Sequence, residues 1–366
     1  MNKPLANAKI AIFYDWLNNW GGAERVLINL LQLYPHAELF TLVHDPAKTQ
    51  WLPKNIIVHP SFLNNFPNSK SNPIYYTPLY NLAIEQFNFS QFDILISTTS
   101  TIGHGLLAPP KTLYICYFHN LNRHVYLDPP PILLPILNIY KKIDQLLIHR
   151  PDYFFCNSKT VYNRLQTIYK ISPKIIYPGV DTQKFVPTNN PTLDYYLVVG
   201  RQVPHKRIDI VIKYFMAHHT KKLIIAGQGR DHQKLVKLGH HSPNVIFIPN
   251  PSDTDLIKLY QNCLALICPQ LEDFGITPLE AQACGRPVIG YRKGGNQETI
   301  ISGKTGILFN QQTTQSLQLA IAKLSRLKIS PRACRQNSLK FSDQNFMLNF
   351  NQHLTKLWQQ HQTTTF

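Results

Sequence analysis

Short apolar runs alternate with amphipathic stretches along the whole chain. The runs are rich in Val, Ile, Leu, Tyr and Phe and have the length of buried strands, whereas the stretches between them carry apolar residues at helical spacing. This alternation predicts parallel sheets that are covered by helices on both faces. One series of runs comprises residues 9–14, 92–97, 112–117 and 153–156, and a second comprises 195–199, 222–226, 245–248, 265–268 and 287–290. The sequence therefore predicts an α/β protein with two domains of this kind.

The boundary between the two domains is expected near residue 190. Residues 187–192 are Pro, Thr and Asn only, which is typical of a linker. We predict an N-terminal domain over 1–188, a C-terminal domain over 189–345 and a final helical segment over 346–366. A chain of 366 residues is long enough for two cored domains of about 150 to 200 residues each. Ligands of open α/β sheets bind beyond the carboxyl ends of the strands, so each domain should contribute loops to binding.

Composition narrows the class of protein. No apolar run approaches the roughly 20 residues that span a bilayer, and the first eight residues lack the apolar core of a signal peptide, so a cytoplasmic protein is expected. The six cysteines are scattered singly among apolar neighbours, which favours buried reduced thiols over a zinc or redox site. The fifteen histidines do not cluster as metal ligands either.

The net charge of +17 points to an anionic partner. Nucleic acid, anionic lipid and a phosphorylated substrate each fit such a charge. The basic residues are spread over the chain without a dense block, which disfavours nucleic acid. The stretch 129–147, with Lys141 and Lys142, suggests peripheral attachment to an anionic membrane surface, at the inner membrane face.

The most informative segment is 272–280, in which two glutamates flank a turn that opens a helix. Thr277 is a good N-cap, Pro278 fits the first helical position, and Gly285 is suited to end the helix. The N–H groups of the preceding turn then lie at a positive helix end, where phosphate binds. These N–H groups belong to Phe274, Gly275 and Ile276.

The two glutamates have different alternatives. Glu280 stands three residues after Thr277, so it is also explained as the acid of a capping box. Glu272 precedes the helix and has no capping role. A carboxylate beside an anion site is unfavourable unless it binds hydroxyl groups, so Glu272 is the candidate for holding a sugar.

Glu272 and Glu280 are separated by seven residues and are surrounded by Asp-Phe-Gly, Pro-Leu-Glu-Ala and Gly-Arg-Pro-Val-Ile. This segment resembles glycosyltransferase family 4, whose members are retaining enzymes of the GT-B fold, with two Rossmann-like domains facing across a cleft. The resemblance implies that Glu272 contacts the donor sugar, that Glu280 holds the nucleotide ribose, and that the turn N–H groups meet the sugar and diphosphate. It also implies an acceptor mostly on the first domain, a nucleotide on the second, and a last helix that crosses back to the first.

Two glycine-containing loops are further candidates for phosphate binding. The loop 200–207 follows the first strand of the second domain, and its Arg201 and Lys206 are either solvated or bind a diphosphate. The resemblance assigns both to the leaving diphosphate. Gly21 and Gly22 follow the first strand of the chain and open a helix, which is also what a simple tight turn requires. Within the family pattern, Gly22 approaches the donor diphosphate or the acceptor.

His119 ends a strand of the first domain. It begins a His-x-x-x-Arg segment that is similar to mannosyltransferase-like family members, in which the histidine contacts the donor sugar. Those members have Thr-Pro where this chain has Asn120-Leu121, so the sugar is left open, and a structural histidine is the alternative.

We expect no metal and no bound cofactor. The sequence Asp253-Thr254-Asp255 has the letters of a metal-binding motif but follows Pro-Ser and is better explained as the cap of a helix that runs through Tyr260. Arg201, Lys206 and the helix end would then neutralise the leaving phosphate.

The expected function is transfer of a hexose, with mannose as one candidate, in glycan or polysaccharide biosynthesis. The donor would be GDP-mannose or a UDP-hexose, and the acceptor a saccharide or a lipid-linked saccharide. Two alternatives stay open: a nucleotide-sugar epimerase of the same fold, and a basic nucleic-acid or membrane-binding protein without transferase activity.

Overall fold

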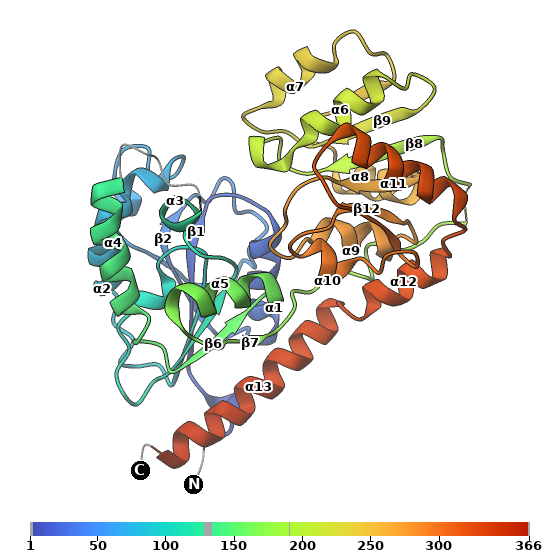
Figure 1. The fold of residues 1–366 in the computed structure, drawn as a ribbon. Coiled ribbons are helices and arrows are strands. Elements are labelled where there is room, and N and C mark those ends of the chain that lie inside the picture. Colours follow the sequence, from blue (N-terminus) through green and yellow to red (C-terminus); the bar gives the residue numbers. More distant parts are fainter. Residues whose placement is uncertain (1–2, 128–133, 190, 365–366) are drawn as a thin grey trace. The chain divides into compact units, whose positions relative to one another are not determined.

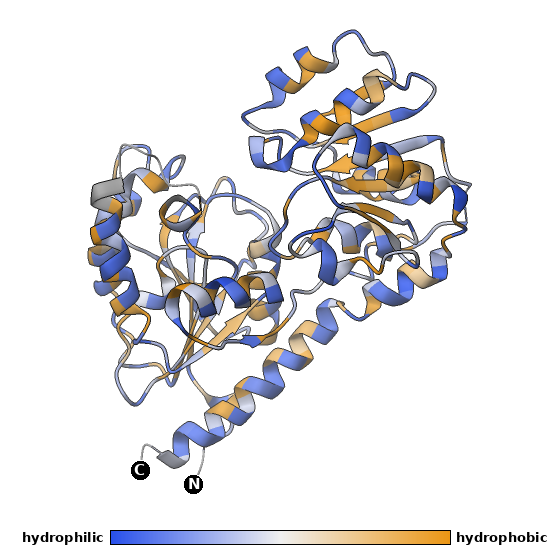
Figure 2. Cartoon of the chain, in the orientation of Figure 1, coloured by the Kyte–Doolittle hydropathy of each residue, from blue (hydrophilic) through white to orange (hydrophobic). Residues whose placement is uncertain are grey.

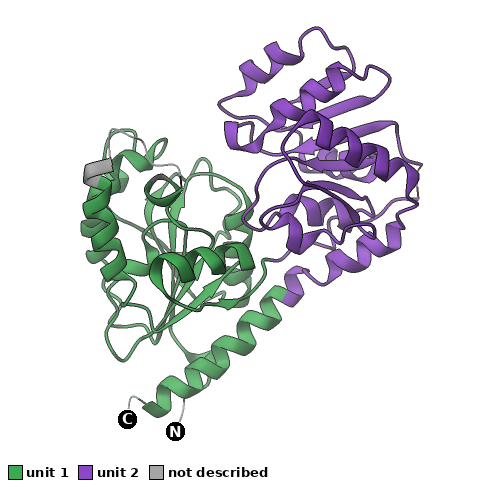
Figure 3. Ribbon diagram, in the orientation of Figure 1, with its two compact units in different colours: residues 1–178, 346–366 green, residues 179–345 purple. Residues whose placement is uncertain are grey.

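The computed structural model describes residues 3–127, 134–189 and 191–364. The chain divides into two compact units, residues 1–178 with 346–366 and residues 179–345 (Figure 3). The first unit therefore ends at Pro178, earlier than the linker composition indicates. Residues 179–188 belong to the second unit because they pack on it: Val180 N–H donates to Phe341 O at 2.8 Å, and the Phe185 side chain is in its core.

The first unit contains a seven-stranded parallel sheet with the order β3-β2-β1-β4-β5-β6-β7 (Figure 1). The strands are β1 (Ile10–Leu17), β2 (Glu38–His44), β3 (Val58–Pro60), β4 (Ile94–Thr99), β5 (Leu113–Phe118), β6 (Tyr153–Cys156) and β7 (Lys174–Ile175). The helices are α1 (Gly22–Leu33), α2 (Tyr80–Glu85), α3 (Arg123–Tyr126), α4 (Leu134–Leu147), α5 (Lys159–Tyr169) and, from Phe346 on, α13 (Asp343–Thr364). Short 3-10 helices are η1 (Leu5–Asn7), η2 (Phe62–Asn65), η3 (Pro73–Leu79) and η4 (Gly103–Gly105).

Strand β1 shows why this sheet is covered on both faces. Successive side chains of a strand point to opposite faces. Ile10, Ile12 and Tyr14 accordingly belong to one buried cluster, and Ala11 and Phe13 belong to another. A strand that is apolar at every position can be buried only between two layers of helices.

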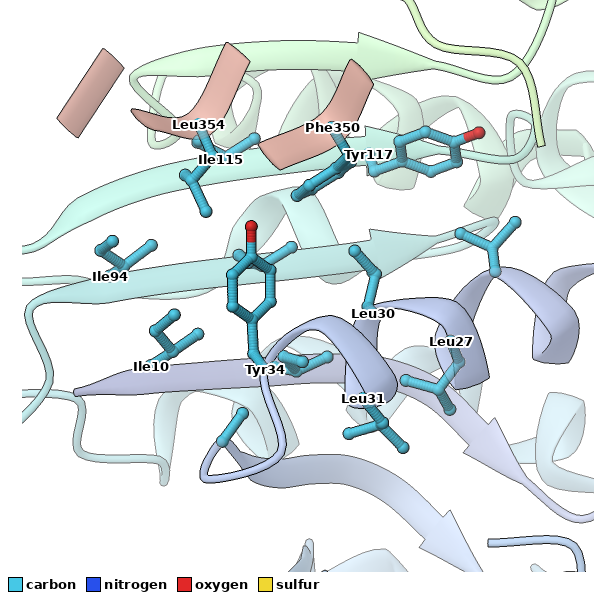
Figure 4. Close-up of a cluster of buried hydrophobic side chains, with 14 of the residues drawn as sticks. Ile10, Leu27, Leu30, Leu31, Tyr34, Ile94, Ile115, Tyr117, Phe350 and Leu354 are labelled. Carbon is cyan, nitrogen blue, oxygen red and sulfur yellow. The ribbon is translucent and has the colours of Figure 1, made fainter. Parts of the chain in front are cut away.

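Helix α13 completes one of these layers. Its Phe346, Phe350, Leu354 and Trp358 recur every four residues and are all buried in the cluster that contains Ile10. Figure 4 shows Phe350 and Leu354 beside Ile115 and Tyr117 of β5. The C-terminal segment is thus part of the first unit's core.

The second unit contains a six-stranded parallel sheet with the order β10-β9-β8-β11-β12-β13. The strands are β8 (Tyr195–Val199), β9 (Lys222–Ala226), β10 (Val245–Ile248), β11 (Ala265–Cys268), β12 (Val288–Tyr291) and β13 (Gly306–Phe309). The helices are η6 (Pro204–Lys206), α6 (Ile208–Met216), α7 (His232–Gly239), α8 (Asp253–Asn262), α9 (Ile276–Ala283), α10 (Asn296–Thr299), α11 (Thr314–Arg326) and α12 (Pro331–Leu339). Figure 2 shows apolar residues concentrated in the strands, and separate buried clusters form the core of this unit.

Each sheet has a point at which the strand order reverses. In the first unit the chain moves from β1 to β2 on one side and later to β4 on the other, and in the second unit β8 stands between β9 and β11 in the same way. Loops that follow the two central strands at such a point diverge and leave room for a ligand beyond the carboxyl edge. The residues after β1, β4, β8 and β11 are therefore the candidates for ligand binding.

All six cysteines are free thiols and are buried, as the sequence predicts. Burial raises the pKa of Cys263 to about 12, so this thiol is not a reactive thiolate at neutral pH. Among the described residues, no helix has the length and hydropathy that crossing a bilayer requires.

Candidate active site

An ion pair bridges the point of strand reversal in the second unit. Lys206 ends the loop that follows β8, and Glu272 follows β11. Lys206 Nζ lies 2.6 Å from Glu272 Oε1, and Gln270 Nε2 donates to the same oxygen at 2.6 Å. The two charged side chains keep 19% and 17% of their surface exposed, so the pair is sheltered but open to a ligand. The structure thus brings together two residues that lie far apart in the sequence.

The environment of Glu272 keeps its carboxyl group ionised. Burial would raise its pKa, but the Lys206 ammonium and the Gln270 hydrogen bond outweigh burial and hold the pKa below its ordinary value. Glu272 is therefore a carboxylate at neutral pH and accepts hydrogen bonds. A carboxylate of this kind binds hydroxyl groups and does not act as a proton donor.

The turn 274–276 leads into α9, although the cap differs from the prediction. Gly275 is the N-cap with φ of 92°, and the helix begins at Ile276. The prediction of Thr277 as N-cap is wrong because Gly275 reaches the left-handed conformation that starts the helix earlier. Pro278 lies in the first turn, where no N–H is needed, and Gly285 follows the helix with φ of 77° as predicted.

Two glycines support the backbone that carries Glu272. Gly295 N–H donates to Glu272 O at 2.8 Å, and Gly294 forms a bridge with Glu272. A Cβ on Gly295 would lie 2.0 Å from Phe274 O, so no other residue fits there without displacing the turn. Asn296 Nδ2 donates to Gln270 O at 3.1 Å. The sequence shows the Gly-Gly-Asn segment but not that it lies behind the 272–275 turn.

Glu280 lies in a different environment from Glu272. Its side chain is 1% exposed, and its Oε2 accepts a hydrogen bond from Tyr260 of α8 at 2.6 Å. The capping-box alternative required Thr277 as N-cap, and Gly275 occupies that position instead. Glu280 thus connects α8 and α9 inside the second unit.

Arg201 is exposed on the loop that follows β8. Gln202, which is fully buried, fixes this loop: its Nε2 donates to Gly227 O at 2.5 Å and its Oε1 accepts from His232 Nδ1 at 2.8 Å. The Arg201 guanidinium has no hydrogen bond or ion pair to the described residues, so it is available to a ligand. Gln202 is not predictable as a functional residue from the sequence, because a single glutamine in a basic loop has no distinguishing pattern.

The Asp-x-Asp sequence lies at the start of α8, but the N-cap is Ser252 and not an aspartate. Asp253 and Asp255 lie in the first turn of α8, and Ser252 Oγ accepts from Asp255 N–H as the N-cap. Asp253 pairs with Lys184 at 2.6 Å. No group of three or more His, Cys, Asp or Glu side chains in the described parts of the chain is arranged to hold a metal ion.

In the first unit, His119 follows β5 at the carboxyl edge of the sheet. Its side chain is 7% exposed, and its Nε2 lies 2.5 Å from Thr98 Oγ1. Burial lowers the pKa of His119 to about 3, so the imidazole is neutral. Gly22 is the first residue of α1 and is exposed, and Gly21 before it is extended, with φ of −171°.

Asp15 is a further buried group at this edge. Thr99 Oγ1 and Ser100 N–H donate to its carboxylate at 2.7 and 2.6 Å, which ties β1 to the end of β4. Burial raises the pKa of Asp15, against the opposing effect of these hydrogen bonds. Asp15 was not among the predicted site residues, although a single aspartate near the carboxyl end of an apolar strand is typical of a functional position.

Comparison with known proteins agrees with this architecture. Residues 180–341 match the family described as glycosyl transferases group 1, and residues 20–184 match glycosyltransferase family 4. An α-1,3/1,6-mannosyltransferase of Dictyostelium discoideum is 25% identical over 98% of this chain and 100% of its own length. An uncharacterized glycosyltransferase of Methanocaldococcus jannaschii is 28% identical, and the match spans 52% of this chain and about half, 54%, of that relative.

Solved structures share the fold. Sucrose-phosphate synthase of Thermosynechococcus elongatus has a TM-score of 0.77 and 17% identity, with 96% of this chain and 99% of that chain covered. Anabaena HepE, solved in complex with UDP-glucose, has a TM-score of 0.73 and 17% identity, with 95% and 99% covered. Since the two family matches lie one on each unit and the fold agrees over nearly the whole chain, the protein belongs to glycosyltransferase family 4 and is a glycosyltransferase of the GT-B fold.

Proposed function

We propose that the protein transfers a hexose from a nucleotide-diphosphate sugar to a saccharide or lipid-linked acceptor, with retention of configuration and without a metal ion. The observation that carries this proposal is the Lys206–Glu272 pair at the strand reversal of the second unit. It offers one cation and one hydroxyl-binding carboxylate side by side, which are the groups that a sugar diphosphate needs. The mannosyltransferase relative makes mannose one candidate, and the UDP-glucose complex of the structural neighbour makes glucose another.

The donor diphosphate is assigned to the loop after β8 and to the turn before α9. Arg201 is exposed and suits bidentate binding, and Lys206 adds a point charge. The N–H groups of Phe274, Gly275 and Ile276 precede or begin α9 and lie at its positive end. Glu272 is assigned to hydroxyl groups of the donor sugar because it is ionised and lies beside these phosphate-binding groups.

In the proposed reaction, the bond between the anomeric carbon and the β-phosphate oxygen breaks, and the electron pair goes to that oxygen. Arg201, Lys206 and the α9 end stabilise the negative charge that develops. The acceptor hydroxyl oxygen bonds to the anomeric carbon on the face that the phosphate leaves, and its proton passes to the leaving phosphate. The products are the glycoside and the nucleoside diphosphate. Proton NMR of the product tests retention, since an inverted anomeric centre contradicts it.

Glu280 is assigned to the nucleotide ribose, and a structural role is the alternative. Ribose binding is supported by the spacing from Glu272, whereas burial to 1% and the hydrogen bond from Tyr260 support a structural role. Binding of the free nucleotide to Glu280→Gln decides between them. In the first unit, Gly22 is assigned to the donor diphosphate or the acceptor, and His119, as a neutral imidazole, to the sugar.

Helix α4 supports the proposal of peripheral membrane contact. Leu137 and Leu147 on its inner face are buried, whereas Ile139 and Leu146 on its outer face are 64% and 71% exposed. The outer face thus combines exposed apolar side chains with polar ones, as in helices that lie on a membrane surface. The neighbouring Lys142 is exposed and suits an anionic lipid surface. Residues 129–133 of the predicted stretch lie outside the described residues.

The test of the function is a donor screen with the purified protein in EDTA. GDP-mannose, UDP-glucose, UDP-galactose and UDP-N-acetylglucosamine are each tested for thermal stabilisation and for slow release of the sugar. Stabilisation by one donor, with turnover in EDTA, supports the proposal. Isomerisation of the donor without acceptor supports the epimerase instead, and no response to any donor supports a binding protein. Activity that depends on added Mg²⁺ or Mn²⁺ contradicts metal independence.

A further inference from the structure

Two tryptophans meet at the carboxyl edge of the first sheet. Trp20 follows β1 and Trp51 follows β2, and these strands are parallel neighbours, so the loops after them leave the sheet at the same edge. The two ring centroids are 5.1 Å apart, with an interplanar angle of 56°. Trp51 packs against the core of the first unit, whereas Trp20 is 49% exposed. Trp20 is therefore an exposed ring supported by a neighbour that is anchored in the core.

The surroundings of Trp20 are polar and fixed. Asn18 is buried and donates from Nδ2 to Lys70 O at 2.9 Å. The exposed Asn19 donates in turn from its Nδ2 to Asn18 Oδ1 at 2.9 Å. Gly21 and Gly22 follow directly and open α1. An apolar ring, an oriented amide and accessible backbone thus lie within five consecutive residues.

The same edge of the first sheet carries the point at which the strand order reverses. β1 and β4 flank the point of strand reversal, and Asp15 ties their carboxyl ends together. His119 lies at the same edge, after β5. A ligand on Trp20 would therefore lie at the edge where open α/β sheets hold their substrates.

We propose that the Trp20 ring is the platform on which a sugar ring of the acceptor stacks. A pyranose has an apolar C–H face and a rim of hydroxyl groups, so the face packs on an indole and the rim binds amide and backbone groups. Asn19 and the backbone at Gly21 and Gly22 supply those groups. A lipid chain needs a wider contiguous apolar surface than one indole between asparagines and glycines offers. Because Trp51 holds the ring in place, little side-chain entropy is lost on binding.

The inference rests on the proposed transferase function and is tested with the full chain. Wild-type protein and the variants Trp20→Ala, Trp20→Phe and Ile57→Ala are compared with octyl and p-nitrophenyl glycosides of mannose, glucose, galactose and N-acetylglucosamine. Ile57 is the matched control, since it is 59% exposed but precedes β3 at the opposite edge of the sheet. Donor hydrolysis without acceptor is measured in parallel, together with the melting temperature of each variant.

We expect Trp20→Ala to raise the acceptor KM about five- to tenfold, with donor hydrolysis and melting temperature unchanged. Trp20→Phe keeps an aromatic ring and should raise the acceptor KM less, and Ile57→Ala should have the acceptor KM of the wild type. Tryptophan emission of the wild type should change on titration with the glycosides that bind, and Trp20→Phe should abolish that change.

An unchanged acceptor KM in folded Trp20→Ala overturns the inference. So does the absence of any emission change of the wild type with all of the glycosides. These outcomes differ from failure of the proposed function, which shows as a wild type that neither binds nor hydrolyses any donor.

Discussion

Replacing Lys206 with alanine probes the central ion pair most directly. At 2.6 Å and an effective dielectric constant of about 20, the attraction between the Lys206 and Glu272 charges is roughly 6 kcal/mol before desolvation is subtracted. Because both side chains keep nearly a fifth of their surface exposed, we expect the fold to lose only about 2 kcal/mol, between the values of exposed and fully buried pairs.

The effect on catalysis should be larger than the effect on stability. Removing one group that stabilises charge in a transition state lowers kcat by about 10²- to 10³-fold. Lys206→Ala should therefore reduce turnover of a saturating donor by that factor, and Lys206→Arg, which keeps the charge, should retain more activity. Lys213→Ala is the control, since Lys213 lies in the same unit, is 57% exposed and is 4.0 Å from Asp209.

The pH dependence gives an independent check. The pKa of Glu272 lies below its ordinary value of 4.5, so its ion pair stabilises the fold above that value and is lost as the pH falls through the lowered pKa. Without Lys206 the burial of Glu272 is no longer outweighed, so its pKa should rise and the acid limb of activity should move to higher pH. The assay is donor hydrolysis from about pH 4 to 8, with urea unfolding at the same pH values. A Lys206→Ala variant with turnover within threefold of wild type, or with an unshifted acid limb, refutes the reasoning.

Three further substitutions test separate parts of the structure. Gly295→Ala places a Cβ 2.0 Å from Phe274 O. It should destabilise the second unit by about 2 kcal/mol or more and should lower donor affinity. A wild-type melting temperature and donor affinity would contradict the packing argument. Tyr260→Phe removes the hydrogen bond to Glu280 and should lower the free energy of unfolding by about 1.5 to 3 kcal/mol, measured by urea denaturation. A smaller change would show that this hydrogen bond does not fix the position of the Glu280 side chain. Leu146→Gln should weaken sedimentation of the protein with vesicles that contain anionic phosphatidylserine. Leu319→Gln is the control, since Leu319 is 68% exposed on α11, and it should sediment as the wild type does. Equal sedimentation of the two variants would show that α4 is not the membrane contact.

The hydrophobic pattern predicts most of the strands but not β2, β3, β7 and β13. Residues 222–226, 245–248 and 265–268 were predicted as strands and form β9, β10 and β11. The reason is local: a short, nearly continuous apolar run is typical of a parallel strand with helices on both faces of its sheet. The unit boundary was predicted less well, because linker composition describes the chain at 187–192 and not the packing of Val180 and Phe185 on later residues.

Part of the candidate site is likewise predictable from the sequence, and part depends on tertiary contacts. Residue type and spacing select Glu272, Lys206 and the turn before α9 as candidates, because the sequence features of a helix start lie within a short segment. Thr277 was preferred over Gly275 as the cap because sequence propensities do not show that Gly275 adopts a positive φ. The hydrogen bond of Glu280 to Tyr260, and the place of Gly295 behind Phe274, are contacts between distant segments.

The sequence alone thus determined the class of fold, the position of the turn before α9 and the family to which the chain belongs. Only the tertiary structure decided which side chains meet: Lys206 with Glu272, Asp15 with Thr99 and Trp20 with Trp51. The physical reason is the range of the interactions. Backbone preference and hydrophobic period act over a few residues, whereas the partner of a charge or a ring depends on which strands become neighbours in the sheet.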